Sequence, residues 1–145
     1  MIYFFRACSN VFLRLSRIYL HICVFDVCHW QHYQNLSDAE RKYDHVTVNE
    51  KCDNTLSGWY RFQGAAGTKM VTTCPPMSRC DAAFPIWLNG SHPTVAEGEV
   101  TRNICINKFA CCAISFPIQA KNCGSYYIYT LFKPGHCNAR YCSTD

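Results

Sequence analysis

From residue 52 onward, large hydrophobic and polar side chains alternate in short runs that glycine, proline and asparagine interrupt. Residues 59–63 (WYRFQ) alternate with a period of two, the pattern of a half-buried strand. Residues 64–67 (GAAG) predict a turn, and residues 68–74 are a second β-prone run, so the two runs are expected to pair as a hairpin. The two prolines at 75–76 end the second run, because proline cannot donate to a strand ladder.

Further strands are predicted toward the C-terminus. Residues 84–88 form a short apolar run that ends at the Asn89-Gly90 turn, and residues 99–109 are another candidate strand. The clearest hairpin joins residues 113–121 to residues 126–132 (YYIYTLF) through a Cys-Gly-Ser turn. Nearly every residue of 126–132 is β-branched, aromatic or apolar, which favours a central strand that is buried on both faces.

One short helix is predicted near residue 40. Ser37 has the side chain of a helix N-cap, and Glu40 follows three residues later, which together form a capping-box pattern. The helix is expected to run for about two turns. The fold class predicted from these patterns is α+β and mostly β: a small disulfide-rich antiparallel sheet domain with one short N-terminal helix.

Residues 1–27 differ in character from the rest of the chain. Arginines at positions 6, 14 and 17 precede an apolar stretch over 18–27, an arrangement similar to a secretory signal peptide. His21 and Asp26 interrupt that stretch, and no small-residue cleavage site follows, so a poorly defined N-terminal extension and an amphipathic helix stay open as alternatives. The stretch is too short for a transmembrane helix. We expect one domain over residues 28–142, followed by a tail over 143–145.

Cysteine usage points to an oxidising compartment. The 145-residue chain contains 12 cysteines, a density typical of secreted disulfide scaffolds. Two of them, Cys8 and Cys23, fall in the possible signal segment, and the remaining ten permit five bridges with no free thiol. These ten are Cys28, Cys52, Cys74, Cys80, Cys105, Cys111, Cys112, Cys123, Cys137 and Cys142.

The pairing of the ten cysteines cannot be deduced from their order. Adjacent residues on a strand point to opposite faces, so Cys111 and Cys112 are expected to bond different partners. A structural zinc site is disfavoured, because the local pairs Cys74/Cys80 and Cys137/Cys142 are spaced too widely for the usual motif. No calcium loop of the EF-hand type is present in the sequence, and we expect no metal and no cofactor.

The charge distribution argues against a nucleic-acid partner. The formal net charge is +4, and lysine and arginine are scattered without a basic run. Ser91 and His92, with Glu97 nearby, match no hydrolase motif, and Pro93 suggests a rigid loop in which His92 packs beside Trp87. Arg61 is expected to pair with an acid across strands. We therefore predict that the chain is not an enzyme.

Several local sequences together resemble a known family. Residues 85–93 (PIWLNGSHP) are the most specific, and they occur with residues 58–62 (GWYRF), the double cysteine Cys111-Cys112 and the tyrosine-rich strand after Cys123. This order resembles the cysteine-rich domain, with eight or ten cysteines, of uromodulin, the pancreatic zymogen-granule membrane glycoprotein and the oncoprotein-induced transcript 3 protein. Large members carry EGF-like or zona pellucida modules beside this domain, so filament assembly is not carried over to this chain.

Two N-glycosylation sequons are present, at Asn89-Gly-Ser91 and Asn35-Leu-Ser37. The family resemblance implies that a glycan on Asn89 presents mannose to lectins, including bacterial pilus adhesins. The alternative is a glycan that only aids folding and solubility. We therefore expect an extracellular, non-catalytic recognition or adhesion module that contacts lectins or other extracellular proteins, or else a purely structural module of a larger glycoprotein.

Overall fold

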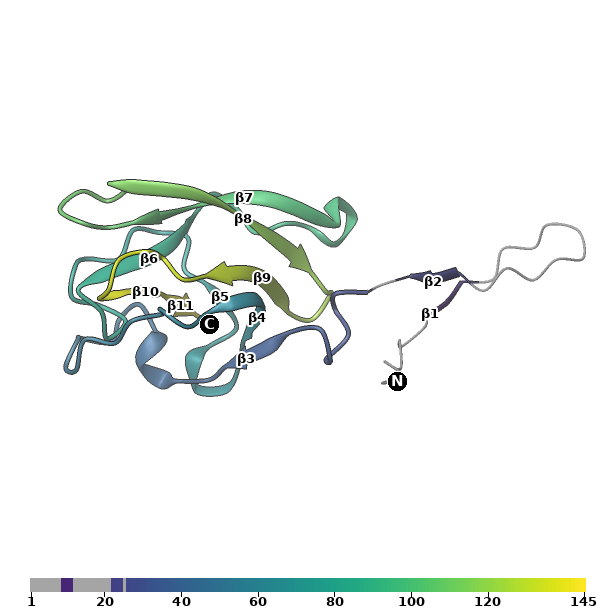
Figure 1. The fold of residues 1–145 in the computed structure, drawn as a ribbon, viewed down its shortest axis with the longest axis horizontal. Helices are drawn as coiled ribbons and strands as arrows, with labels where there is room; N and C mark the ends of the chain where they lie inside the picture. Colours follow the sequence, from purple (N-terminus) through teal and green to yellow (C-terminus); the bar gives the residue numbers. More distant parts are fainter. Residues whose placement is uncertain (1–8, 12–21, 25) are drawn as a thin grey trace, which may run out of the picture.

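The computed structural model describes residues 9–11, 22–24 and 26–145. The hairpin of β7 (Glu99–Ile106) and β8 (Ile114–Asn122) forms the top of the domain in Figure 1, and the other strands of the main sheet lie below it. The main sheet has seven strands, in the spatial order β10 (Ala139–Tyr141), β6 (Phe84–Asn89), β7 (Glu99–Ile106), β8 (Ile114–Asn122), β9 (Tyr127–Phe132), β4 (Ser57–Phe62) and β3 (Gln34–Leu36). Two smaller sheets pair β1 (Ser9–Val11) with β2 (Ile22–Val24), and β5 (Lys69–Met70) with β11 (Ser143–Thr144).

The predicted class of mostly β, disulfide-rich domain is confirmed, and the sheet predicted to be antiparallel is a mixed one. Strands β3 and β4 pair in parallel, as do β10 and β6, and the other neighbours in the main sheet are antiparallel. Parallel pairs need long connections. Residues 37–56 connect β3 to β4, and residues 90–138, which include β7, β8 and β9, connect β6 to β10.

The hydrophobic core lies against one face of the main sheet. Alternate residues of the strands point into it, as the period-two pattern predicted. Strand β9 lies between β8 and β4, and Ile128, Tyr129 and Leu131 are buried while Phe132 is exposed. The fully buried apolar residues of the main cluster include Met70, Ile86, Leu88, Ile104, Ile106, Tyr129, Leu131 and Tyr141. Val71, Cys80 and Cys142 form a second, smaller cluster, against which Trp87 packs.

The hairpin predicted for residues 59–74 does not form. Strand β4 pairs with β9 and β3, whereas β5 pairs with the distant strand β11. The turn between β4 and β5 is a 3-10 helix, η2 (Gly64–Ala66), and not a hairpin turn. Gly67 follows with φ +81°, and a Cβ there would contact the backbone of Thr144, so a side chain would block the approach of β11. Residues 143 and 144, expected to be a tail, thus form this strand.

The predicted two-turn helix is also wrong. Only one 3-10 turn forms there, η1 (Ala39–Arg41), and its N-cap is Asp38, which makes no capping hydrogen bond. The physical reason is that the Arg41 side chain is buried and donates hydrogen bonds to the carboxylate of Asp53, twelve residues later. This contact fixes the backbone at Arg41 in a short turn. A capping box does form elsewhere, at the 3-10 turn η3 (Val95–Glu97), where Thr94 and Glu97 cap each other.

A buried cluster of charges joins the segment before β4 to strand β10. The carboxylate of Asp53 accepts hydrogen bonds from two nitrogens of Arg41, at 2.8 and 2.7 Å, and from the backbone N–H of Tyr141 at 2.9 Å. Arg140 is 2% exposed; it donates to Asp38 at 2.7 Å and lies 4.0 Å from Asp53. Each buried charge therefore has an opposite partner, which is the condition for burying ions at acceptable cost.

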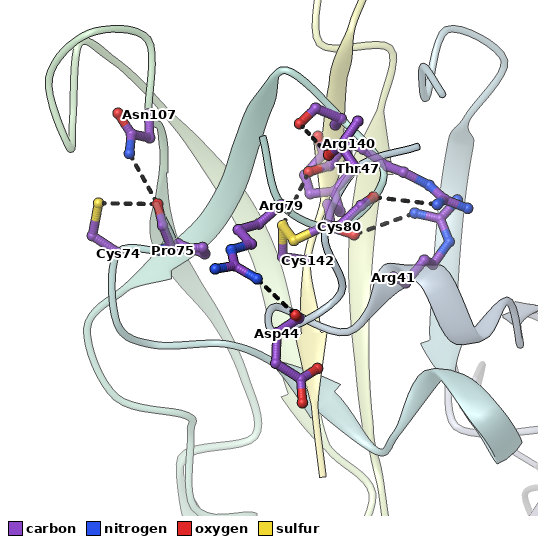
Figure 2. Close-up of a disulfide and its surroundings, with 12 residues drawn as sticks. Arg41, Asp44, Thr47, Cys74, Pro75, Arg79, Cys80, Asn107, Arg140 and Cys142 are labelled. Carbon is purple, nitrogen blue, oxygen red and sulfur yellow. Dashed lines mark hydrogen bonds between the residues drawn. A yellow bond between two sulfur atoms is a disulfide. The ribbon is translucent and has the colours of Figure 1, made fainter. Parts of the chain in front are cut away.

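Four disulfides link the described residues: Cys28–Cys123, Cys74–Cys111, Cys80–Cys142 and Cys105–Cys112. Figure 2 shows that Cys80–Cys142 lies beside Arg140, whose guanidinium donates to the Cys80 carbonyl at 3.3 Å. The expectation that Cys111 and Cys112 bond different partners is confirmed. They lie in the turn between β7 and β8, however, and not on a strand.

The possible signal segment, residues 1–27, lies largely outside the described residues. Its two described portions up to residue 24 are β1 and β2, which pair with each other. Within the part of the chain that the structure describes, no helix is long and apolar enough to cross a membrane.

We expect the substitution Asp53→Asn to lower the free energy of unfolding by about 3–5 kcal/mol, because it leaves two buried guanidinium groups without their shared counter-charge. Urea unfolding followed by tryptophan fluorescence measures the change. Asp145→Asn is the matched control, since its partner Lys42 holds an exposed pair whose loss costs about 1 kcal/mol or less. Equal unfolding midpoints for the two variants would show that the buried cluster contributes no net stability.

Candidate functional site

The principal sequon begins at the end of β6. Ile86 and Leu88 are fully buried in the core, so the alternation of the strand directs Asn89 to the opposite, outer face, where its side chain is exposed. Gly90 follows with φ +135°, a backbone conformation that allows the chain to leave the strand at once. Ser91, the third residue of the sequon, is also exposed. The acceptor amide is therefore accessible from solvent.

The loop after the sequon is held by several polar contacts. Arg102 donates to the Ser91 carbonyl at 3.0 Å and to the Glu97 carboxylate at 2.8 Å. Glu97 also accepts from the backbone N–H of Thr94 at 2.7 Å. The Thr94 N–H and then the Arg102 guanidinium lower the pKa of Glu97 to about 2, so this carboxylate is ionised at any physiological pH. These contacts fix the loop that follows Asn89.

His92 packs in the same loop against aromatic side chains of β9. Its ring centroid lies 4.6 Å from that of Tyr127 and 6.0 Å from that of Tyr129. The expected contact with Trp87 is therefore wrong, because the loop turns back over β9. Burial, with a smaller contribution from the charge of Lys69, lowers the pKa of His92 to about 4. The imidazole is thus neutral at pH 7 and contributes packing.

The second sequon lies on the edge strand β3. Asn35 is exposed and stands opposite Arg61 of β4 in the parallel register. Ser37 is exposed between β3 and η1, and it is not the helix cap that the sequence suggested. Among the residues that the structure describes, no acid pairs with Arg61. Its guanidinium lies 4.0 Å from the centre of the Tyr126 ring and donates to the Tyr33 hydroxyl at 3.4 Å.

Two of the ten predicted half-cystines are thiols in the structure. Cys52 is half-buried and Cys137 is exposed. They are neighbours, because the backbone N–H of Asp53 donates to the carbonyl of Ala139 at 3.1 Å and the Cys52 thiol donates to the carbonyl of His136 at 3.7 Å. Burial and the nearby Cys137 thiol raise the pKa of Cys52. A fifth bridge between these two cysteines stays a prediction.

Other candidate chemistry is limited in the described part of the chain. No group of three or more histidine, cysteine, aspartate or glutamate side chains there is arranged to hold a metal ion. The buried cluster of Arg41, Asp53 and Arg140 was missed by sequence reasoning, because nothing local distinguishes these residues from solvated charges. The capping pair Thr94 and Glu97 was missed although its spacing, T-x-x-E, is a known signature.

These features define a class of protein: a small disulfide-bonded β domain with accessible sequons on its outer surface. Residues 60–143 match the family model described as uromodulin-like, D8C domain. The match covers more than half of the chain, which therefore belongs to the uromodulin-like D8C domain family. The disulfides and this membership make it an extracellular module, as the cysteine content predicted.

Full-length relatives agree with the family model. The chain is 45% identical to mouse uromodulin over 113 residues, which is 77% of this chain and 17% of the relative. It is 41% identical to the rat pancreatic secretory granule membrane major glycoprotein GP2 over 127 residues, which is 84% of this chain and 23% of the relative. It is 37% identical to the human GP2 over 125 residues, which is 85% of this chain and 23% of the relative. The chain thus spans about a fifth of the length of these proteins.

We predict that secreted protein contains a Cys52–Cys137 bridge. Unreduced protein treated with a thiol alkylator and digested should yield the linked peptides by mass spectrometry, with no alkylation at either cysteine. The Cys52→Ser variant is the control, because it should expose Cys137 to the reagent. Alkylation of both cysteines in the parent would instead establish a stable dithiol.

The neutral state of His92 predicts a loss of stability as the pH falls. Its folded pKa, about 4, lies below the ordinary value of 6.5, so the unfolded chain takes up a proton that the native domain excludes. Stability is full above pH 6.5 and declines as the pH falls toward 4. Between pH 7 and 5 we expect a loss on the order of 1 kcal/mol, since the ring is only partly buried.

Thermal unfolding at pH 7, 6 and 5 measures this effect, with His92→Gln and the exposed-site control His136→Gln compared to the parent. The slope of stability against pH should flatten in the first variant and persist in the second. An unchanged slope in His92→Gln would assign the dependence to other groups.

Proposed function

We propose that this domain is a non-catalytic extracellular recognition module that displays a glycan on Asn89 to mannose-binding lectins, including bacterial pilus adhesins. The observation that carries the proposal is the position of Asn89. It is the exposed last residue of a strand whose preceding residue is fully buried. A glycan can project from this position without disturbing the core.

The surroundings of Asn89 support presentation from a rigid base. Strand β6 is hydrogen-bonded on both sides, to β7 and β10, and the loop after the sequon is held by Arg102 and by the Thr94–Glu97 capping box. A glycan attached to such a base loses less freedom when a lectin binds it, which favours affinity. The Asn35 sequon lies on an edge strand with one neighbour and is the weaker candidate for display.

A second candidate function is a structural module of a larger glycoprotein. Two disulfides favour it, since Cys28–Cys123 and Cys80–Cys142 fasten both limits of the predicted domain, residues 28–142, to the main body. A module anchored in this way transmits force between its neighbours without unravelling from its ends. Under this function the Asn89 glycan would serve folding and solubility, and contacts would be made with other extracellular proteins.

We expect a mannose-binding pilus adhesin to bind the secreted parent domain and to lose at least about tenfold in affinity for the Asn89→Gln variant. The substitution removes the glycan acceptor and keeps a polar amide on an exposed site, so folding should be retained. Binding to immobilised protein, measured by surface plasmon resonance, gives the comparison.

Asn35→Gln is the matched control, because it removes the other sequon, which is also at an exposed position. Parent treated with a glycosidase and parent with excess free mannose should both lose binding. Adhesin binding that persists in Asn89→Gln would show that the adhesin binds a glycan on Asn35 or the protein surface. A glycosylated parent that does not bind would leave the structural module as the function.

A further inference from the structure

An aromatic residue precedes each sequon asparagine by two positions. Trp87 precedes Asn89, and Tyr33 precedes Asn35. In an extended chain, residues i and i+2 point to the same side and lie about 7 Å apart. Each ring is therefore an aromatic side chain on the face from which its asparagine projects.

Trp87 is held firmly beside Asn89. Its cross-strand partner is Cys105 of β7, and its indole Nε1 donates to the carbonyl of Cys111 at 2.8 Å. It packs against the small cluster of Val71, Cys80 and Cys142 on the side of the sheet away from the main core. The ring is partly exposed, so it is both immobile and accessible.

Tyr33 has the same relation to Asn35, established by independent contacts. Arg61 is the cross-strand partner of Asn35, and the Arg61 guanidinium reaches the Tyr33 hydroxyl. Tyr33 and Asn35 therefore lie on one face. The Tyr33 ring is also packed against Tyr126, with a centroid separation of 5.6 Å, which fixes its position.

We propose that the first N-acetylglucosamine of each glycan stacks on the aromatic ring two residues before its asparagine: on Trp87 for Asn89 and on Tyr33 for Asn35. This inference rests on the proposed glycosylation. One face of the sugar ring exposes several C–H groups with partial positive charge, and the face of an aromatic ring is electron-rich, so the two surfaces attract each other. The contact also removes apolar area of both rings from water.

Stacking would give the protein-proximal sugar two roles. It would add to the stability of the folded domain, because the folded strand holds the ring and the sugar on one face, whereas an unfolded chain samples that arrangement only among many others. It would also restrict the direction in which the outer mannose residues project, since the first sugar is fixed at both its linkage and its face. The bare domain would lose both effects.

Two enzymatic treatments separate the first sugar from the rest of the glycan. An endoglycosidase that cuts between the two core N-acetylglucosamines leaves one sugar on each asparagine, and an amidase removes the whole glycan. In a chain that keeps only the Asn89 sequon, through Asn35→Gln, we expect the trimmed form to keep the thermal midpoint of the untreated form. The amidase-treated form should melt about 2–6 °C lower, the range for one aromatic contact in a domain of this size.

The same comparison in the Trp87→Leu background tests the partner. The variant itself will melt lower than the parent, so the measured quantity is the difference between its trimmed and amidase-treated forms, which should fall to near zero. Trp30→Leu is the control, because Trp30 is 68% exposed and does not stand two residues before a sequon asparagine. Its difference should equal that of the parent. The same test at Asn35 uses the Asn89→Gln chain, which keeps only the Asn35 sequon, and compares its trimmed and amidase-treated forms with and without Tyr33→Leu.

Proton NMR of the trimmed protein adds a measurement, the chemical shifts of the sugar protons, that does not depend on the stability of the fold. The acetamido and ring protons of the sugar should shift upfield through the indole ring current and return to ordinary positions in Trp87→Leu. A midpoint difference that survives in Trp87→Leu, or unshifted sugar protons in the parent, would overturn the stacking while leaving lectin display intact. Mass spectrometry showing unoccupied asparagines would instead overturn the glycosylation on which both proposals rest.

Discussion

The buried carboxylate of Asp53 is the contact on which the domain depends. Its two oxygens receive two guanidinium hydrogen bonds from Arg41 and one backbone hydrogen bond from Tyr141, and Arg140 lies next to it. A charge at this depth has lost most of its hydration, and only such charge-assisted hydrogen bonds offset the loss. The segment before β4, the turn η1 and strand β10 must therefore assemble together, because no one of them satisfies its charges alone.

This cluster is connected to the glycan site through β6. Strand β10 pairs in parallel with the first half of β6, with Arg140 opposite Pro85, and the sequon occupies the other end of the same strand. The Cys80–Cys142 bridge adds a covalent tie beside Arg140 (Figure 2), and Arg41 donates to the carbonyl of Tyr141, the residue before Cys142, at 3.3 Å. One end of β6 is thus fixed by charges and a disulfide, while the other reaches solvent.

Sequence patterns predicted the strands that pack one face on the core, because a period of two is a direct consequence of that packing. They failed where a distant residue determined the local structure. The capping pattern at Ser37 predicted a helix that does not form, because the Arg41 side chain is bound to Asp53. Residues 69–70 pair with a strand more than seventy positions away, which no local pattern indicates. The sequons could be identified from the sequence, because a glycosyltransferase recognises three adjacent residues. The contact of His92 with Tyr127 depended on a loop path that no local pattern encodes.

The two edges of the main sheet are protected by different means. Along β10, the segment at Asp53 supplies a backbone donor to Ala139 and a carboxylate acceptor to Tyr141, so this edge offers few open groups to another chain. Strand β3, at the other edge, is three residues long and bears Asn35 at its centre. A sugar there would stand across the path of an incoming strand. Resistance to aggregation at high protein concentration would then rest on a carboxylate at one edge and on a carbohydrate at the other.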